Sequence, residues 1–228
     1  MEPNEVTLFP YEVDMFVNIL SAKMAEKLGL NHEMMNVPAM WAQTKGRGIK
    51  IAVLDTGRPE HPDIRVLGSK SFVPREGVDK NGHSTHCSGI INAIAQNGIG
   101  IAGIAPESEL YTGQVLAAAG GGRTKWIVEG IRWAVDEIGA DVISMSLGMP
   151  GKAKRQKNLE KACNYAVNQG VAVFAATGNE GTVVGQPACF DSVIAVGAID
   201  FRKSARDFRT TATRLTSWPA ASASSAPT

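Results

Sequence analysis

Two short segments contain the residue types from which a catalytic relay is built. In Ile51-Ala-Val-Leu-Asp55-Thr-Gly57 a carboxylate follows an apolar run, and in His83-Ser-Thr-His-Cys-Ser-Gly89 an imidazole opens a run of small residues. A carboxylate that orients a histidine, which in turn activates a nucleophile, is the arrangement of many hydrolases. Asp55 and His83 are therefore the candidate acid and base, and the nucleophile is the member still to be found.

Each of these segments also has other interpretations. Asp-x-Gly is common in turns at strand ends. The Asp55-Thr-Gly triplet also resembles the carboxylate segment of aspartic proteases, but these pair two carboxylates, so one triplet would require a dimer. His83 and His86 are spaced like metal ligands, without an evident third ligand.

Three further segments have properties suited to peptide chemistry. The backbones of Ser146-Leu147-Gly148 and of Gly120-Gly121-Gly122 can pair with an extended peptide, because strand addition needs only an accessible edge. In Ala176-Thr-Gly-Asn179, the amide of Asn179 can donate a hydrogen bond to a developing oxyanion. Each segment is equally compatible with an ordinary glycine turn.

The elements that must position these residues alternate along the chain. Short apolar runs predict strands over 49–54, 110–116, 142–147, 171–176 and 193–199, and apolar residues at helical spacing lie between them, from Trp126 to Ile138 and from Leu159 to Val167. Buried strands alternating with helices predict a parallel sheet covered on both faces. The candidate residues follow the carboxyl ends of strands, where such sheets carry their sites.

Composition restricts the class of protein. The 228 residues suit one α/β domain, 44% of them are hydrophobic, and the net charge of +1 argues against nucleic acid as a partner. No apolar run is long enough for a membrane span, and the acidic start predicts no signal peptide. Cys87, Cys163 and Cys189 are expected to be free thiols in a reducing cytoplasm, with no zinc site.

The chain order of four of these motifs, Asp55-Thr-Gly, His83-Ser-Thr-His86, Ser146-Leu-Gly and Thr177-Gly-Asn, resembles that of the subtilisin-like serine proteases, in which acid, histidine and serine follow one another along the chain. The resemblance covers about residues 36–207 and implies a three-layer α/β fold with a mostly parallel central sheet, incomplete at the C-terminus. It makes Asp55 the orienting acid, His83 the base and Asn179 an oxyanion-hole donor. Protein or peptide substrates would lie along two backbone edges and a neighbouring pocket, formed by Gly120, Gly121, Gly122, Ser146, Leu147, Gly148, Ala176, Thr177 and Gly178.

Two positions next to His83 bear on this resemblance. Ser84 stands where the family usually has glycine, and we expect this small side chain to be tolerated. Cys87 also has counterparts in some family members, and we expect a packed thiol.

The N-terminal part resembles the intracellular branch of that family. Leu8-Phe9-Pro10-Tyr11 is similar to the branch's Leu-Ile-Pro-Tyr motif, which lies on an extension that covers the active site. We therefore expect an inhibitory extension over residues 1–40 and a partial peptidase domain over 41–208. A plain hydrophobic anchor is the alternative for the extension. The oligomeric state is left open, a homodimer included.

A structural calcium site is implied by the same resemblance. The segment 95–101 is similar to the family's calcium loop, and calcium prefers oxygen ligands. The implied ligands are the side chains of Asp63 and Asn97 and the carbonyls of Ala95, Ile99 and Ile101.

The serine nucleophile is missing from the pattern. No Gly-Thr-Ser-Met-Ala-like motif follows, and residues 209–228 form a Ser/Thr/Ala/Pro-rich tail in which Ser217, Ser222, Ser224 and Ser225 have no helix to hold them. Shifted by two nucleotides, codons for 213–228 can spell Glu-Ile-Asp-Leu-Val-Ala-x-Gly-Val-Gly-Ile-Val-Ser-Thr, which resembles the family segment preceding the nucleophile. The sequence thus predicts a serine endopeptidase with a frameshift near 208–211, inactive as written. A catalytically dead peptide-binding protein is the alternative.

Overall fold

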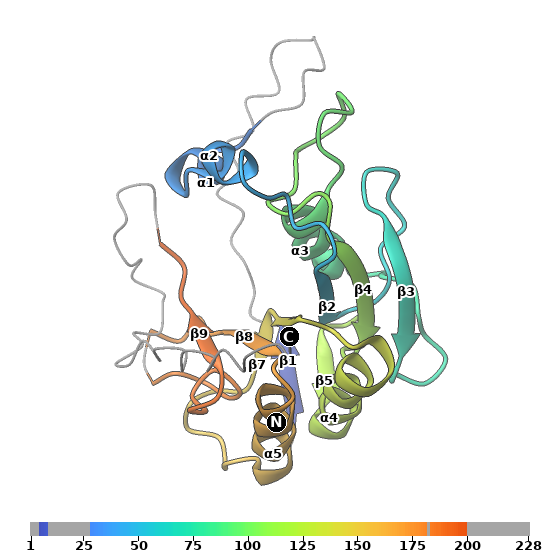
Figure 1. Ribbon diagram of the computed structural model, residues 1–228. Helices are drawn as coiled ribbons and strands as arrows, with labels where there is room; N and C mark the ends of the chain where they lie inside the picture. The colour runs from blue at the N-terminus through green and yellow to red at the C-terminus, as the bar shows by residue number, and fades with distance from the viewer. Residues whose placement is uncertain (1–4, 9–27, 182, 200–228) are drawn as a thin grey trace, which may run out of the picture.

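The computed structural model describes residues 5–8, 28–181 and 183–199. They form a six-stranded sheet and a separate three-stranded one (Figure 1). The tail, with its four serines, and Phe9 to Tyr11 of the expected inhibitory extension lie outside these residues.

The six-stranded sheet is parallel throughout, in the order β3-β4-β2-β6-β8-β9. Its strands, in that order, are Val66–Ser71, Glu109–Gln114, Lys50–Asp55, Val142–Met145, Ala172–Ala176 and Ile194–Val196. This confirms the predicted parallel sheet. Sequence analysis missed β3, because this edge strand is half exposed and lacks a continuous apolar run. The run predicted over 193–199 is strand only at Ile194–Val196, and the run over 142–147 divides into β6 and β7.

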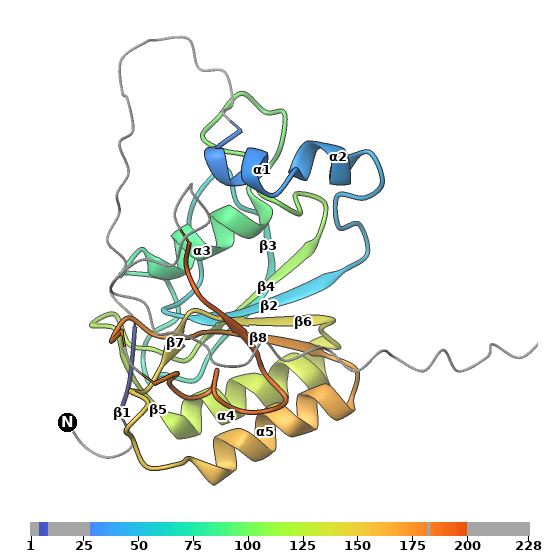
Figure 2. The same cartoon turned by 90° about the vertical axis from the view of Figure 1, so that its left-hand side faces the viewer.

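Helices cover both faces of this sheet, which makes the fold three-layered (Figure 2). On one face lies α3, His83–Asn92, and on the other lie α4, Thr124–Trp133, and α5, Lys157–Asn168. The helical spacing from Trp126 to Ile138 is confirmed, although its last turn, Ala134–Ile138, is a short π-helix, η1. These helices shield the buried strands from water, as the near-continuous apolar runs require.

The alternation of side chains along β2 determines which face carries Asp55. Ala52 and Leu54 belong to the larger core, together with residues of α4 and α5, whereas Ile51 and Val53 pack with Ile91 of α3. Because successive strand residues point to opposite faces, Asp55 follows Ile51 and Val53 onto the face of α3. The carboxylate therefore lies on the face that carries His83.

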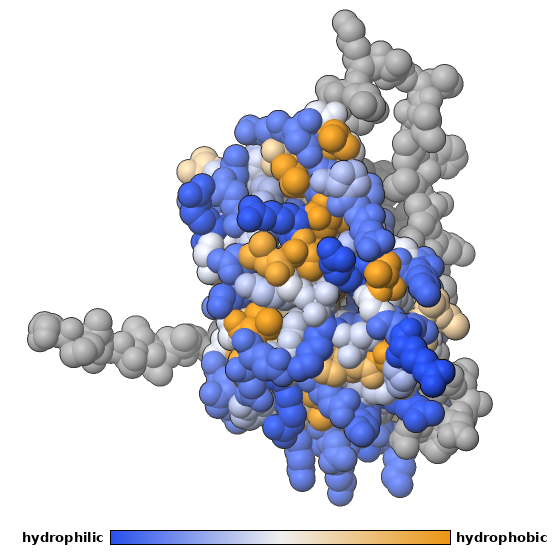
Figure 3. Space-filling view, turned by 90° about the vertical axis from the view of Figure 1, so that its right-hand side faces the viewer, coloured by the Kyte–Doolittle hydropathy of each residue, from blue (hydrophilic) through white to orange (hydrophobic). Residues whose placement is uncertain are grey.

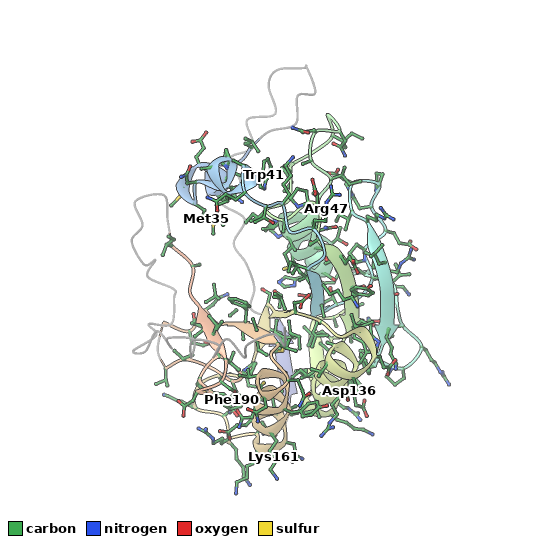
Figure 4. The ribbon with its side chains drawn as sticks, in the orientation of Figure 1. Met35, Trp41, Arg47, Asp136, Lys161 and Phe190 are labelled. Atoms are coloured by element: carbon green, nitrogen blue, oxygen red, sulfur yellow. The ribbon has the colours of Figure 1, made fainter. Side chains whose placement is uncertain are left out.

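Two short helices, α1 (Leu30–Met34) and α2 (Val37–Trp41), precede the sheet and lie near α3 (Figure 1). The indole N–H of Trp41 donates a hydrogen bond to the carbonyl of Ile104 at 2.8 Å, and Arg47 pairs with Glu107 at 3.0 Å. Figure 4 shows Trp41 and Arg47 at the end of the molecule opposite Lys161 of α5. These contacts fix the segment through which the N-terminal part enters the domain.

The small sheet joins distant parts of the chain in the order β5-β1-β7. Its central strand β1, Glu5–Leu8, runs antiparallel to β5, Gly121–Arg123, and to β7, Leu147–Gly148. An N-terminal segment therefore occupies the space between two edges of the main domain.

The surface along the β3 edge is polar with small apolar patches. Figure 3 shows these patches separated by hydrophilic residues, and Leu67 of β3 is among the exposed hydrophobic side chains. Within the described ranges, no helix combines the length and the apolarity that a membrane crossing requires.

Candidate active site

The structure brings Asp55 and His83 into direct contact. Asp55 ends β2 and His83 begins α3, and the Nδ1 atom of His83 lies 2.8 and 2.9 Å from the two carboxylate oxygens. Both side chains are almost fully buried. Because an ionised carboxylate only accepts hydrogen bonds, Nδ1 carries a proton in both charge states of the ring, and Nε2 is the nitrogen that gains or loses one.

A second carboxylate, Asp79, fixes the first turn of α3 against the end of β2. Its Oδ1 accepts hydrogen bonds from the N–H groups of Asn81 and Gly82 and from the hydroxyl of Thr56. Its Oδ2 accepts from both the N–H and the hydroxyl of Thr85. A helix start leaves N–H groups without intrahelical partners, and Asp79 satisfies part of this demand.

Thr56 and Ser84 complete this connection. The hydroxyl of Thr56 accepts a hydrogen bond from the N–H of Ser84 at 3.1 Å, and the hydroxyl of Ser84 donates to the carbonyl of Gly57 at 2.6 Å. Gly57 has a φ of +143°, and a Cβ there would lie 2.7 Å from the backbone nitrogen of Asp79. Only glycine permits this approach, and serine at position 84 adds a buried hydrogen bond.

The electrostatics of His83 favour its charged form. Burial alone lowers its pKa, but the hydrogen bond and charge of Asp55, with a contribution from Cys87, raise the pKa from 6.5 to about 10. At His86, burial and the charge of His83 lower the pKa below its usual value. An imidazolium at His83 is therefore stabilised by the pair, which is what a base needs after it accepts a proton.

Cys87 lies beside this pair as a half-buried free thiol. Its Sγ is 3.8 Å from Nδ1 and 4.0 Å from Nε2 of His83. Histidine, cysteine, aspartate and glutamate side chains can bind a metal ion. Among the residues that the structure describes, one group of at least three of these side chains has its ligand atoms close enough together, and it consists of Asp55, His83 and Cys87. His86 is not part of it, so the structure gives no support to the His83–His86 ligand pair.

The two predicted backbone edges flank an extended strand. Thr7 of β1 lies opposite Gly121 on one side and Gly148 on the other, and Leu8 lies opposite Leu147. A Cβ at Gly122 would lie 2.6 Å from the carbonyl oxygen of Val115, so glycine keeps β5 close to the body of the domain. Ser146 separates β6 from β7.

The remaining predicted site residues follow β8. Thr177 and Gly178 are buried, and Asn179 is half-buried. The N–H of Thr177 donates to the carbonyl of Val196, which holds this segment against the next strand of the sheet. The segment after β8 thus lies at the carboxyl end of the sheet, as Asp55 does.

Two of the five residues expected to bind calcium, Asp63 and Asn97, are in direct contact. Asp63 is buried, with 3% of its surface exposed, and its Oδ1 accepts a hydrogen bond from the Asn97 amide at 2.6 Å. The Asn97 side-chain oxygen accepts from the N–H of Ile99 at 2.8 Å. A buried carboxylate beside a side-chain amide supplies the oxygen ligands that a hard cation prefers, so Asp63 and Asn97 fit the ion.

Sequence reasoning missed the residues that hold these parts together. Asp79 and Asn81 are spaced four and two residues before His83, and a carboxylate shortly before a helix start was the available signal. The Asn81 amide donates to the carbonyl of Ala118 at 2.8 Å, and Glu76 accepts from the N–H of Ala118 at 3.2 Å. The loop before β5 is thereby tied to the loop that precedes His83.

An aspartate–histidine pair at the carboxyl edge of a parallel sheet, next to edges that bind an extended strand, defines the class of α/β peptidases with an acid–base relay. The sequence model of the subtilase family matches residues 46–227. The chain belongs to the subtilase family.

Individual relatives agree with this assignment. The chain is 38% identical over 219 residues to the "Intracellular serine protease" of Paenibacillus polymyxa and 39% identical over 224 residues to the "Major intracellular serine protease" of Bacillus subtilis (strain 168). Each match covers 90% of this chain, and respectively 64% and 66% of the relative. With "Subtilisin Savinase" of Lederbergia lenta the identity is 43% over 166 residues, covering 72% of this chain and 60% of the relative. The two intracellular relatives agree with the intracellular branch indicated by the sequence.

The chain therefore spans less than two thirds of the length of these relatives.

Proposed function

We propose that this chain acts as part of a subtilisin-type serine endopeptidase that hydrolyses peptide bonds in proteins. The observation that carries the proposal is the buried contact of 2.8 Å between His83 Nδ1 and Asp55 at the carboxyl end of β2, in a domain whose strands β5 and β7 bind an extended strand. Family membership supports the same activity.

In this mechanism Asp55 holds the Nδ1 proton of His83, and Nε2 takes the proton of the serine hydroxyl as its oxygen attacks the peptide carbonyl. The proton then passes from Nε2 to the leaving amine, and an acyl-enzyme remains. Water attacks the ester with His83 again as base, which releases the acid and restores the serine. Asn179 would donate a hydrogen bond to the oxyanion, and removing such a donor from a subtilisin, a member of the same family, costs roughly 10²–10³ in turnover.

The serine itself is the unassigned member. We infer that the frame changes near residues 208–211 and that the other frame encodes the nucleophile segment. The Ser/Thr/Ala/Pro-rich composition of 209–228 supports this inference, since it has no apolar periodicity. Sequencing the gene downstream of codon 208 tests it, and a shifted frame without a Thr-Ser-Met-like motif would refute it.

We further propose that the N-terminal extension inhibits the site. Pairing of β1 with both β5 and β7 supports this, because a substrate would need the same backbone edges. Pro10 lies two residues after Leu8, and a proline near the scissile position resists productive placement.

A structural calcium ion bound by Asp63, Asn97 and the carbonyls of Ala95, Ile99 and Ile101 is part of the proposal. It would stabilise the loop and take no part in the reaction. The names of the intracellular relatives support a cytoplasmic location.

Hydrolysis of a fluorogenic peptide by the product of the complete gene tests the function. We expect activity in the wild type and a loss of at least about 10³-fold in both Asp55→Asn and His83→Ala. Labelling by a fluorophosphonate reports the serine directly. Peptide binding without labelling or hydrolysis would instead favour the peptide-binding alternative.

A further inference from the structure

Arg123 occupies a defined place beside the bound strand. In the antiparallel ladder of β1 and β5 it lies opposite Glu5, next to the pair of Val6 with Gly122. Directly opposed residues of an antiparallel pair have Cβ atoms about 4.5–5.5 Å apart. A peptide bound in place of β1 therefore presents the residue at the register position of Glu5 to Arg123.

The surroundings of Arg123 are cationic. A cavity of about 940 Å³ lies next to β5, and Arg123 and Lys125 line it together with Trp126, Gln156 and Asn158. None of its lining residues is acidic. The guanidinium carbon of Arg123 lies 5.5 Å from the centre of the Trp126 ring, a contact that orients the charge.

The two cations of the cavity differ in their partners. Lys125 has an acidic neighbour on α4, Glu129, at 3.7 Å. Among the residues whose side chains the structure describes, from 28 onward, no ion pair is formed by Arg123, whose side chain is exposed. Of the two, Arg123 is thus the cation that an incoming carboxylate would meet at the register position of Glu5.

We propose that Arg123 is a specificity-determining residue that selects peptides with Asp or Glu at the register position of Glu5. The inference rests on the proposed function, because it assumes that substrates bind where β1 lies. The charges are exposed to water, so the expected preference is modest, about two- to five-fold in Kd over a neutral residue. Salt reduces it, because exposed charges are screened.

Binding of short labelled peptides to the full chain tests this inference. The fluorescein-labelled pentapeptides Glu-Val-Thr-Leu-Phe and Gln-Val-Thr-Leu-Phe differ only in the charge at that position, and fluorescence anisotropy gives the Kd of each. Because β1 competes equally with both peptides, the ratio of the two Kd values does not depend on it. We expect the acidic peptide to bind about two- to five-fold more tightly at low salt, and this ratio to approach one in Arg123→Gln.

Lys125→Gln is the matched control and should keep the ratio of the wild type. Arg123→Glu should reverse the preference, so that Lys-Val-Thr-Leu-Phe binds more tightly than the acidic peptide. Equal binding of the acidic and neutral peptides to the wild type, or a ratio that survives in Arg123→Gln, would overturn this inference alone. Binding of neither peptide even to Thr7→Pro, in which proline disfavours the pairing of β1, would overturn the proposed cleft as well.

Discussion

Thr56 donates a hydrogen bond from its hydroxyl to Asp79 at 2.8 Å, and the same hydroxyl accepts one from the N–H of Ser84 at 3.1 Å. Thr56 follows Asp55, and Ser84 follows His83. One hydroxyl therefore links the residue after the acid to the residue after the base. Asp79 anchors that link by accepting further hydrogen bonds from the first turn of α3.

Replacing Asp79 by alanine should destabilise the fold by about 1–2 kcal/mol, because N–H groups at the start of α3 lose their acceptor. Burial raises the pKa of Asp79, but hydrogen bonds from Thr85, Gly82 and Thr56 outweigh this and lower it below 3.8. A lowered folded-state pKa gives stability that is present above 3.8 and is lost as the pH falls through the folded-state value. Urea unfolding at neutral and at acidic pH measures the free energy of unfolding of both proteins. The difference in this free energy between wild type and Asp79→Ala should be smaller at acidic pH.

Glu60→Gln is the control for this prediction, because Glu60 is an exposed carboxylate at 3.7 Å from Arg58. It should leave the free energy of unfolding within about 0.5 kcal/mol of the wild type. An Asp79→Ala variant as stable as Glu60→Gln would contradict the anchoring role.

Asp55→Asn should lower the pKa of His83, because the charge and hydrogen bond that oppose burial are weakened. The titration of the His83 Cε1 proton by NMR measures this without any need for the serine. The raised pKa of His83 stabilises the wild-type fold fully below about 6.5, and this stabilisation is lost as the pH rises toward about 10. The stability difference between wild type and variant should therefore shrink from pH 6 to pH 10.

Glu129→Gln, on α4 at the opposite face of the sheet, supplies the comparison for that titration. It removes one negative charge without touching the pair, so the pKa of His83 should stay close to that of the wild type. Equal shifts in the two variants would mean that Asp55 acts only through the net charge of the protein.

The contact between Asp55 and His83 could be expected from the sequence, because short local patterns indicate both residues. Asp55 ends an apolar run, and the small residues after His83 begin a helix, so both positions follow from patterns a few residues long. Asp79 was missed for a physical reason. Its partners lie on the loop, on α3 and at the end of β2, and only the folded backbone brings these together.

The contrast between local sequence patterns and contacts made only in the folded chain also explains which strands could be predicted. The buried strands β2 and β8 were predicted from apolar runs, whereas β3 is polar along its exposed side and lies at the edge. The short strand β5 contains two glycines and an arginine, a composition with low strand propensity, and it is extended through pairing with β1 on one side and with Leu116 on the other. Such tertiary pairing has no signature within the three residues themselves.

Ser84→Gly should cost about 1–2 kcal/mol, since the variant loses a buried hydrogen bond to Gly57 and places glycine inside a helix. Ser84→Ala separates the two effects, because alanine favours the helix and removes only the hydroxyl. Chemical unfolding of the wild type, Ser84→Ala and Ser84→Gly gives the contribution of the hydroxyl hydrogen bond and that of the glycine backbone separately. Should the glycine variant be as stable as the wild type, the hydroxyl of Ser84 would have no role in holding α3.

Thr7→Pro should release the extension, because Thr7 lies in the central strand of the small sheet and proline removes a backbone donor and disfavours the interior of a sheet. Hydrogen–deuterium exchange should show faster exchange of the amides of residues 5–8 and 121–123. In the product of the complete gene, peptide hydrolysis should rise. Thr7→Val keeps the donor and the strand propensity, so it should behave as the wild type. Unchanged exchange in the proline variant would argue against docking of β1.

Asp63→Asn should abolish stabilisation by calcium. At a free calcium concentration of about 100 times Kd, a bound ion stabilises the fold by about 2.7 kcal/mol, which for a domain of this size corresponds to a rise in Tm of about 5–10 °C. Thermal unfolding with calcium and with EGTA should show that difference in the wild type and lose it in the variant, because the amide removes the negative charge closest to the loop. Glu60→Gln again serves as the control and should keep the calcium response. A wild-type Tm that is the same with calcium and with EGTA would exclude the site, whatever the variants do.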